Sequence, residues 1–207
     1  LFVSFLSTTS GLAQRLSLPF FDDFAVSTNS SISPAKWINA GVSVYPSSAQ
    51  APSFNVATFD GRDARGIPYV TGFSTSVGST DSLTSRPIDL SRTSPKDSLV
   101  LSFFYQAKGT GEAPDQEDSL ILEVRTKLNE WKTIWRAPEN KPLDFSLVLL
   151  SLVDESLFHA DFQLRFRSFG RQTGPFDTWS VDYIYLDTKR NSQRKFFPDI
   201  TISSIQT

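Results

Sequence analysis

The sequence predicts an all-β protein, a two-sheet antiparallel β-sandwich of jelly-roll type. Apolar and polar residues alternate with a period of two in several short segments, which is typical of half-buried strands. Aromatic residues make up 13% of the chain and include 18 Phe, and these residues favour the pleated surface of a sheet. Turn residues separate the segments and no helical period recurs, so we expect about eight to eleven short strands.

The first half of the chain predicts short strands between loops rich in Ser, Pro and Asn. Pro87 lacks the N–H group that a central strand needs, so the segment that holds it is expected at a sheet edge or at a strand end. The expected strands in this half are Leu18–Phe24, Val42–Tyr45, Phe54–Phe59, Tyr69–Phe73 and Leu83–Leu90.

The second half alternates more regularly. The expected strands are Ser98–Gln106, Asp118–Thr126, Trp131–Trp135, Phe162–Arg167 and Thr178–Leu186. In the first of these, one face carries Leu99, Leu101, Phe103 and Tyr105. We expect the first two to form an antiparallel pair, although the connection between them, Ala107–Glu117, is longer than a hairpin turn usually needs.

One segment, Leu143–Leu157, permits two interpretations. Leu147, Leu150 and Val153 are spaced as on one face of a helix. A strand over Phe145–Leu150 followed by a turn near Asp154 fits the same short apolar run, and we favour the strand.

Composition excludes several kinds of chemistry. The chain has no Cys, which excludes disulfides, thiolate nucleophiles and sulfur-ligated metals. Its only His is His159, so a multi-histidine zinc site is impossible. The net charge of −2 gives no bulk attraction to nucleic acid or anionic lipid. No nucleophile elbow, Walker loop or His-Glu-x-x-His pair occurs, whereas a glycosidase needs only two carboxylates, which spacing does not exclude.

The chain divides into a partial signal peptide at residues 1–13, a jelly-roll domain at 14–188, and a linker or the start of a following segment at 189–207. Leu1–Leu6 is apolar, and Gly11 and Ala13 place small residues before a possible cleavage at Gln14. The alternative is a buried strand over Leu1–Leu6. No stretch reaches the roughly 18 apolar residues that span a bilayer. We therefore expect a secreted or cell-surface protein, exported through the signal peptide, with no membrane-spanning segment.

Six short segments carry a resemblance to a known family. They are Leu18–Phe24, Ala57–Gly61, Asp81–Leu90, Leu101–Gln106, Phe162–Phe166 and Asp177–Tyr183. As a set they resemble the MAM-like jelly-roll module of secreted and cell-surface proteins of Bacteroidota, many of which are exported by type IX secretion. The resemblance implies an exported, non-catalytic β-sandwich module within a larger surface protein.

The resemblance also implies a structural calcium ion that ties the first strand to the last. The matching positions are Asp22 or Asp23, together with Asp182. Calcium binds several hard oxygens and can neutralise carboxylates that chain closure brings together. The alternative is that these residues form turns or accept hydrogen bonds. A second acidic segment, either a cation site or a solvated loop, holds Glu112, Asp115, Glu117 and Asp118.

Candidate ligand-binding residues lie on two expected strands. Gln163, Arg165 and Arg167 form the polar side of Phe162–Arg167, and Arg171 follows them. Guanidinium groups pair with carboxylates or sugar hydroxyls. A charged outer face also keeps a sheet soluble. Trp131 follows a turn, and we select it as the aromatic residue most suited to stack on a sugar. The other Trp and Tyr residues are expected mainly in the core.

Three Asp-Ser-Leu triplets resemble an O-glycosylation signal of exported Bacteroidota proteins. Their acceptors would be Ser82, Ser98 and Ser119. The alternative is that Asp and Ser simply mark the points where loops enter strands.

We therefore predict a non-catalytic module that acts in adhesion or in glycan or protein binding. Its partners would be a polysaccharide, another surface protein, or neighbouring domains of its own chain. Two alternatives are a structural spacer and a carbohydrate-active hydrolase.

Overall fold

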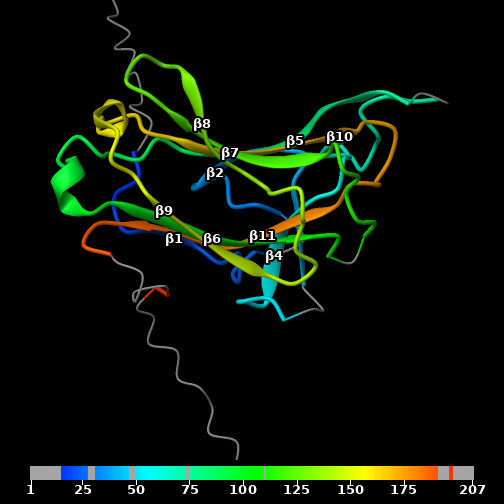
Figure 1. Ribbon diagram of the computed structural model, residues 1–207, viewed down its shortest axis with the longest axis horizontal. Coiled ribbons are helices and arrows are strands. Elements are labelled where there is room, and N and C mark those ends of the chain that lie inside the picture. The colour runs from blue at the N-terminus through cyan, green and yellow to red at the C-terminus, as the bar shows by residue number, and fades with distance from the viewer. Residues whose placement is uncertain are drawn as a thin grey trace, which may run out of the picture.

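The computed structural model describes residues 15–27, 31–46, 50–72, 75–109, 111–190 and 196–197. These residues form two antiparallel sheets that pack face to face, seen edge-on in Figure 1. The expected signal peptide at residues 1–13 lies outside the described residues, as does most of the segment 189–207. Within the described part of the chain, no helix has the length and apolar character needed to cross a bilayer.

The first sheet contains both the first and the last strand of the chain. Its spatial order is β3 (Ser43–Pro46), β4 (Asn55–Phe59), β11 (Trp179–Asp187), β6 (Val100–Ala107) and β9 (Ser146–Ser151). Strand β1 (Phe20–Asp22) also pairs with β11, with Phe20 opposite Leu186. The last strand thus holds three neighbours together.

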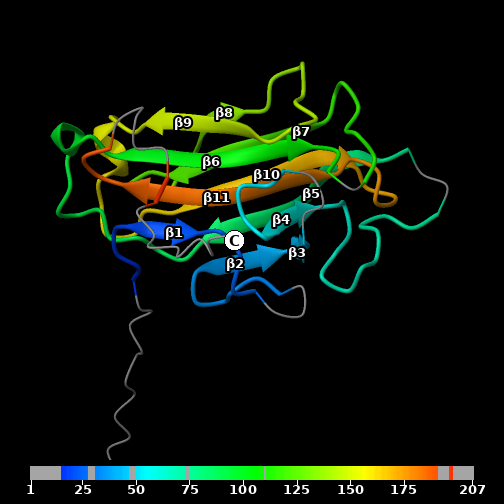
Figure 2. The same ribbon diagram turned by 90° about the horizontal axis from the view of Figure 1, so that it is seen from below.

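The second sheet has five strands. Figure 2 looks onto the face of the sandwich, with the strands of the two sheets overlaid. Their spatial order is β2 (Trp37–Ala40), β5 (Val77–Ser85), β10 (Leu164–Arg171), β7 (Ser119–Arg125) and β8 (Trp131–Arg136). Two short 3-10 helices lie in connections that pass from one sheet to the other: η1 (Pro95–Asp97) between β5 and β6, and η2 (Glu155–Leu157) between β9 and β10. All registered strand pairs are antiparallel, so the predicted fold class is confirmed.

The expected pairing of Ser98–Gln106 with Asp118–Thr126 is wrong. These segments become β6 and β7, which lie in different sheets: β6 pairs with β11 and β9, whereas β7 pairs with β10 and β8. The long connection carries the chain from one sheet to the other. Both strands bury one face in the core between the sheets. The alternation of apolar residues would be the same in either sheet, so it does not indicate which strands are paired.

Two local predictions also fail. The segment of strand β2 was expected to be a loop, because the sequence around it is rich in Ser, Pro, Asn and Ala. In the structure it is a strand in which only Trp37 is buried. Residues 69–72 of the expected strand Tyr69–Phe73 form no strand. They belong to a loop in which the Tyr69 hydroxyl donates to Asp81 and the Val70 N–H donates to the carbonyl of Gln172. Phe73 lies outside the described residues.

The expected strand Leu83–Leu90 is confirmed only over Leu83–Ser85, because β5 begins at Val77 and ends at Ser85. Pro87 follows the strand end, as its missing N–H requires. Ser146–Ser151 is a strand, not a helix, and the turn after it is capped by Asp154, whose carboxylate accepts from the N–H of Ser156.

The core between the sheets is rich in aromatic rings. Phe103 of the first sheet meets Phe166 of the second, with ring centroids 4.8 Å apart in an edge-to-face arrangement. Trp135 packs on the same ring at 5.1 Å. At the other end, the buried carboxylate of Asp22 on β1 accepts from the indole N–H of Trp37 on β2 at 2.6 Å, which joins the two sheets.

Candidate functional site

The structure brings the three expected ligand-binding residues together. Arg165 and Arg167 lie on β10 between core residues, so their side chains point to the outer face of the second sheet. Trp131 on β8 lies opposite Arg125 of β7. The guanidinium carbon of Arg165 lies 4.0 Å from the centre of the Trp131 ring, a cation–π contact. The three residues therefore share one surface, which alternation within single strands does not reveal.

Glu123 of β7 is the centre of this surface. Its carboxylate forms ion pairs with Arg165 at 2.7 Å and with Arg167 at 3.1 Å. Burial alone would raise the pKa of Glu123, but the hydrogen bonds from Arg167 and Arg165 outweigh it and hold the pKa below its ordinary value. The carboxylate is therefore ionised at neutral pH, and it fixes both guanidinium groups in place.

Polar groups surround these residues. Thr84 and Ser82 of β5 lie opposite Arg165 and Arg167, and Ser79 accepts from Nη1 of Arg167 at 2.7 Å. We call this surface the arginine face. It is the outer face of the second sheet that carries Arg125, Arg136, Arg165, Arg167, Glu123 and Trp131.

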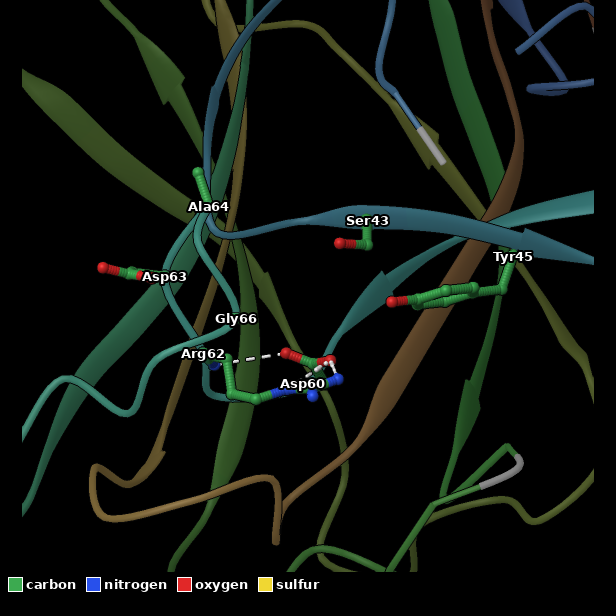
Figure 3. A pocket seen from close by; sticks show the side chains of 7 residues that line it. All are labelled: Ser43, Tyr45, Asp60, Arg62, Asp63, Ala64 and Gly66. Carbon is green, nitrogen blue, oxygen red and sulfur yellow. Dashed lines mark hydrogen bonds and ion pairs between the residues drawn. The ribbon is translucent and has the colours of Figure 1, made fainter. Parts of the chain in front are cut away.

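A hollow on the other sheet was not anticipated. It lies where β3 and β4 meet the loop after β4, and its volume is about 180 Å³. In Figure 3 the hydroxyl groups of Tyr45 and Ser43 point into the same space as the ion pair of Asp60 and Arg62. A second hollow of about 340 Å³ shares Tyr45, Asp60 and Arg62 with it. We call the first the Tyr45 hollow; its lining is Ser43, Tyr45, Asp60, Arg62, Asp63, Ala64 and Gly66.

Asp81 lies close to this region and is fully buried. It accepts hydrogen bonds from the Tyr69 hydroxyl at 2.8 Å and from the N–H of Gly61 at 2.9 Å. Burial raises the pKa of Asp81 to about 6, and nearby Asp60 contributes in the same direction. Both hydrogen bonds act in the opposite direction but do not cancel the effect of burial.

The three residues expected to hold calcium occupy two places. Asp182 is fully buried and accepts from the N–H and the hydroxyl of Ser53, both at 2.9 Å. The Ser53 hydroxyl also lies 2.7 Å from the main-chain carbonyl of Asp23. Asp22 is engaged separately, by Trp37 and by the ammonium of Lys36 at 3.1 Å. Burial raises the pKa of Asp182 to about 7.

The acidic loop forms a second group of carboxylates. Oxygens of Asp115, Asp118 and Asp177 lie within 4.8 Å of one another, close enough to share one cation. Burial raises the pKa of Asp118 to about 7, and the neighbouring Asp177 adds to the effect. Asp177 also accepts from the N–H of Arg171 at 2.7 Å, and Asp118 accepts from the N–H of Asp115 at 2.6 Å. These contacts show that the loop is also held by ordinary hydrogen bonds.

The three expected glycosylation serines differ in exposure. Ser98 is exposed and adopts a left-handed backbone conformation with φ of 52°. Ser82 is half-buried on β5. Ser119 is 5% exposed, and its hydroxyl accepts from Arg136 at 2.8 Å. Of the three serines, Ser98 alone is exposed.

His159 contacts main-chain groups through both ring nitrogens. Nε2 lies 3.0 Å from the carbonyl oxygen of Arg125, and Nδ1 accepts from the N–H of Asp161 at 3.3 Å. In this arrangement the imidazole has a structural role between β7 and the start of β10.

Comparison with known proteins finds similarity of structure only. No protein-family model and no curated protein matches the sequence. The C-terminal family 22 carbohydrate-binding module of Clostridium thermocellum Xyn10B aligns with a TM-score of 0.52, over 82% of this chain and 92% of that chain, at 9% identity. A xylan-binding domain of family 22 aligns with a TM-score of 0.51, over 82% and 93%, at 9% identity. The K2 cleaved adhesin domain of Lys-gingipain aligns at 0.49, over 81% and 98%, with 13% identity.

At these identities the likeness is one of fold. The chain has the two-sheet antiparallel β-sandwich fold of the family 22 modules, which confirms the predicted jelly-roll architecture. The lower TM-score of the adhesin domain adds nothing to this assignment. The finer resemblance to a MAM-like module of Bacteroidota stays a prediction.

Proposed function

We propose that this chain is a non-catalytic glycan-binding module of an exported surface protein, and that it binds its ligand on the arginine face. The observation that carries the proposal is the contact of Trp131 with Arg165, next to the ion pairs of Arg165 and Arg167 with Glu123. The fold shared with carbohydrate-binding modules supports it. The export route through type IX secretion and the surface location remain part of the proposal.

The chemistry of the arginine face suits a sugar. An indole ring offers a rigid apolar surface at little cost in conformational entropy. Guanidinium groups provide several N–H donors in fixed directions, whereas a carboxylate accepts from hydroxyl groups. Glu123 holds both arginines in position before a ligand arrives, so little ordering is needed on binding.

Truncation of Trp131 tests the proposal on a glycan array. We expect Trp131→Ala to weaken retention by about tenfold or more, because aromatic anchors dominate binding energy. Trp131→Phe, which retains a ring, should keep most of the binding. Tyr45→Ala is the matched variant on the other sheet and should bind normally. Loss of binding in Tyr45→Ala alone would move the ligand to the Tyr45 hollow, and silence of the wild-type across the array would favour a structural spacer. Release of reducing sugar from a bound glycan would identify a hydrolase instead.

A structural calcium ion is a separate part of the proposal. The carboxylate of Asp182 and the main-chain carbonyl of Asp23 offer oxygen atoms that could bind calcium. Both contact the hydroxyl of Ser53, next to the paired strands β1 and β11. We leave Asp22 out of this set because its carboxylate receives Trp37 and Lys36.

Chelation tests the calcium proposal. We expect a chelator to lower the melting temperature by about 5 °C or more, and added calcium to restore it, because an ion bound only by the folded state stabilises that state. Asp182→Asn should abolish the response, whereas Asp177→Asn should retain it. The reverse result would place the ion at the cluster of Asp115, Asp118 and Asp177. An unchanged melting temperature in chelator would contradict both.

Glycosylation is proposed at Ser98, whose side chain is exposed although Leu99 of the same triplet is buried. Ser82 and Ser119 also remain predicted glycosylation sites from the sequence. The burial of Ser119 argues against its modification in the folded protein.

A further inference from the structure

The arginine face carries an excess of positive charge. Among the described residues of the five strands in this sheet, the only carboxylates are Glu123 and Asp81. Asp81 is buried and bonded to Tyr69 and Gly61, away from the outer face. The strands carry five guanidinium groups. Arg171, exposed at the end of β10, pairs with Asp115 outside the sheet at 3.7 Å, so the other four share the face with one strand carboxylate, on a chain whose net charge is −2.

Two of these guanidinium groups are held by neutral acceptors. Nη1 of Arg125 donates to the side-chain oxygen of Gln163 at 2.7 Å. Nη1 of Arg136 donates to the hydroxyl of Ser119 at 2.8 Å. Neither contact balances a positive charge. Arg165 and Arg167 both pair with the single carboxylate of Glu123. Two positive charges therefore face one negative charge, and the group has a net charge of +1.

The strand register and the cation–π contact place Arg125 and Arg165 at the Trp131 ring, whereas Arg136 and Arg167 lie further along the sheet. Arg125 lies directly opposite Trp131. Arg136 lies opposite Ile121, which in turn lies opposite Arg167. Neighbouring strands are about 4.8 Å apart, so Arg136 and Arg167 are separated by about 10 Å across the sheet. A chain of sugars that crosses the strands would meet the ring and several guanidinium groups at once.

We propose that the glycan bound on the arginine face is an anionic polysaccharide, with a sugar ring on Trp131 and carboxylate or sulfate groups held by the surrounding arginines. This inference rests on the proposed function and names its ligand class. Guanidinium groups pair with carboxylates and with oxyanions of similar geometry through two parallel hydrogen bonds. Each guanidinium has five N–H donors, so Arg165 and Arg167 keep donors for a ligand while they hold Glu123.

The test compares four polymers of defined charge. The purified protein is titrated with polygalacturonate, dextran sulfate, neutral dextran and single-stranded DNA. We expect tight binding to polygalacturonate or dextran sulfate, and the preferred one identifies carboxylate or sulfate as the group recognised. Binding should weaken by at least tenfold between about 0.01 M and about 0.1 M salt, because the Debye length falls from about 30 Å to about 10 Å.

Charge-neutral variants locate the effect. Arg136→Gln and Arg125→Gln remove guanidinium groups without leaving a buried carboxylate unpaired, and each should weaken binding to the anionic polymer several-fold. Arg65→Gln makes the same charge change at an exposed residue of the loop after β4, on the other sheet, and should leave binding unchanged.

Four results would overturn the inference. Equal binding to dextran, without an effect of salt, would mean that the face takes a neutral glycan; the proposed function would stand. Equal binding to DNA, unaffected by Trp131→Ala, would mean that charge alone is responsible. Failure to bind these polymers while a neutral glycan is retained on the array would again leave only the proposed function, whereas failure with every glycan would remove both.

Discussion

Phe103→Ala will lower the free energy of unfolding by about 3–5 kcal/mol, the largest single effect we expect. The Phe103 side chain is fully buried between the sheets. Its ring contacts Phe166 and Trp135 of the opposite sheet and Tyr105 of its own strand, with centroid distances of 4.8, 5.1 and 6.4 Å. Truncation removes these contacts and leaves a cavity that surrounding strands cannot close, because their hydrogen bonds fix the distance between them.

Urea unfolding at equilibrium measures this loss. The midpoint should fall while the denaturant slope stays the same, since the surface exposed on unfolding changes little. Phe54→Ala is the control: Phe54 is 72% exposed, and its truncation should change stability by less than about 0.5 kcal/mol. A loss below about 1 kcal/mol for Phe103→Ala would show that this ring is not central to the core.

The burial of Phe103 could be predicted from the sequence. Leu99, Leu101, Phe103 and Tyr105 recur at every second position, and this predicted face is buried in the structure; the opposite face of the strand is also largely buried. The sheet to which the strand belongs could not be predicted, because alternation reports which side of a strand is buried and not which strand lies beside it. That information depends on how the loop over residues 107–117 crosses between the sheets.

The same limit applies to the candidate site. Arg165 and Arg167 could be placed on one outer face from alternation alone, and Trp131 could be selected because it follows a turn. The position of Glu123 between the two arginines depends on the register of β7 against β10. The Tyr45 hollow combines a strand end with a loop that follows another strand, and Asp60 and Arg62 meet there through a local turn. No period in the sequence reports such a meeting.

A second large effect concerns the pH dependence of stability. Burial raises the folded-state pKa of Asp81 to about 6, whereas an ordinary aspartate in the unfolded chain titrates near 3.9. Below pH 4 the carboxyl is protonated in both states and its full contribution to stability is present. Between about pH 4 and pH 6 the unfolded chain ionises while the folded protein retains its proton, so the free energy of unfolding falls as pH rises.

The expected size is about 3 kcal/mol, since a pKa difference of about two units corresponds to 1.36 kcal/mol per unit. Asp182, whose pKa is also raised by burial, acts in the same direction. Glu123 acts in the opposite direction, because its pKa is lowered and its contribution is lost as pH falls. The total pH profile therefore mixes both signs, and a single substitution is needed to isolate Asp81.

Asp81→Asn provides that isolation, because the amide is neutral at every pH. The variant loses one favourable acceptor for the Tyr69 hydroxyl or the Gly61 N–H, a cost that does not depend on pH. We expect the stability of the variant relative to the wild-type to improve by about 3 kcal/mol between pH 4 and pH 8, measured by urea unfolding at each pH. Asp144→Asn replaces an exposed carboxylate and should show no comparable trend. A difference between Asp81→Asn and wild-type that stays constant with pH would show that Asp81 is ionised in the folded protein, with its charge stabilised by the hydrogen bonds from Tyr69 and Gly61.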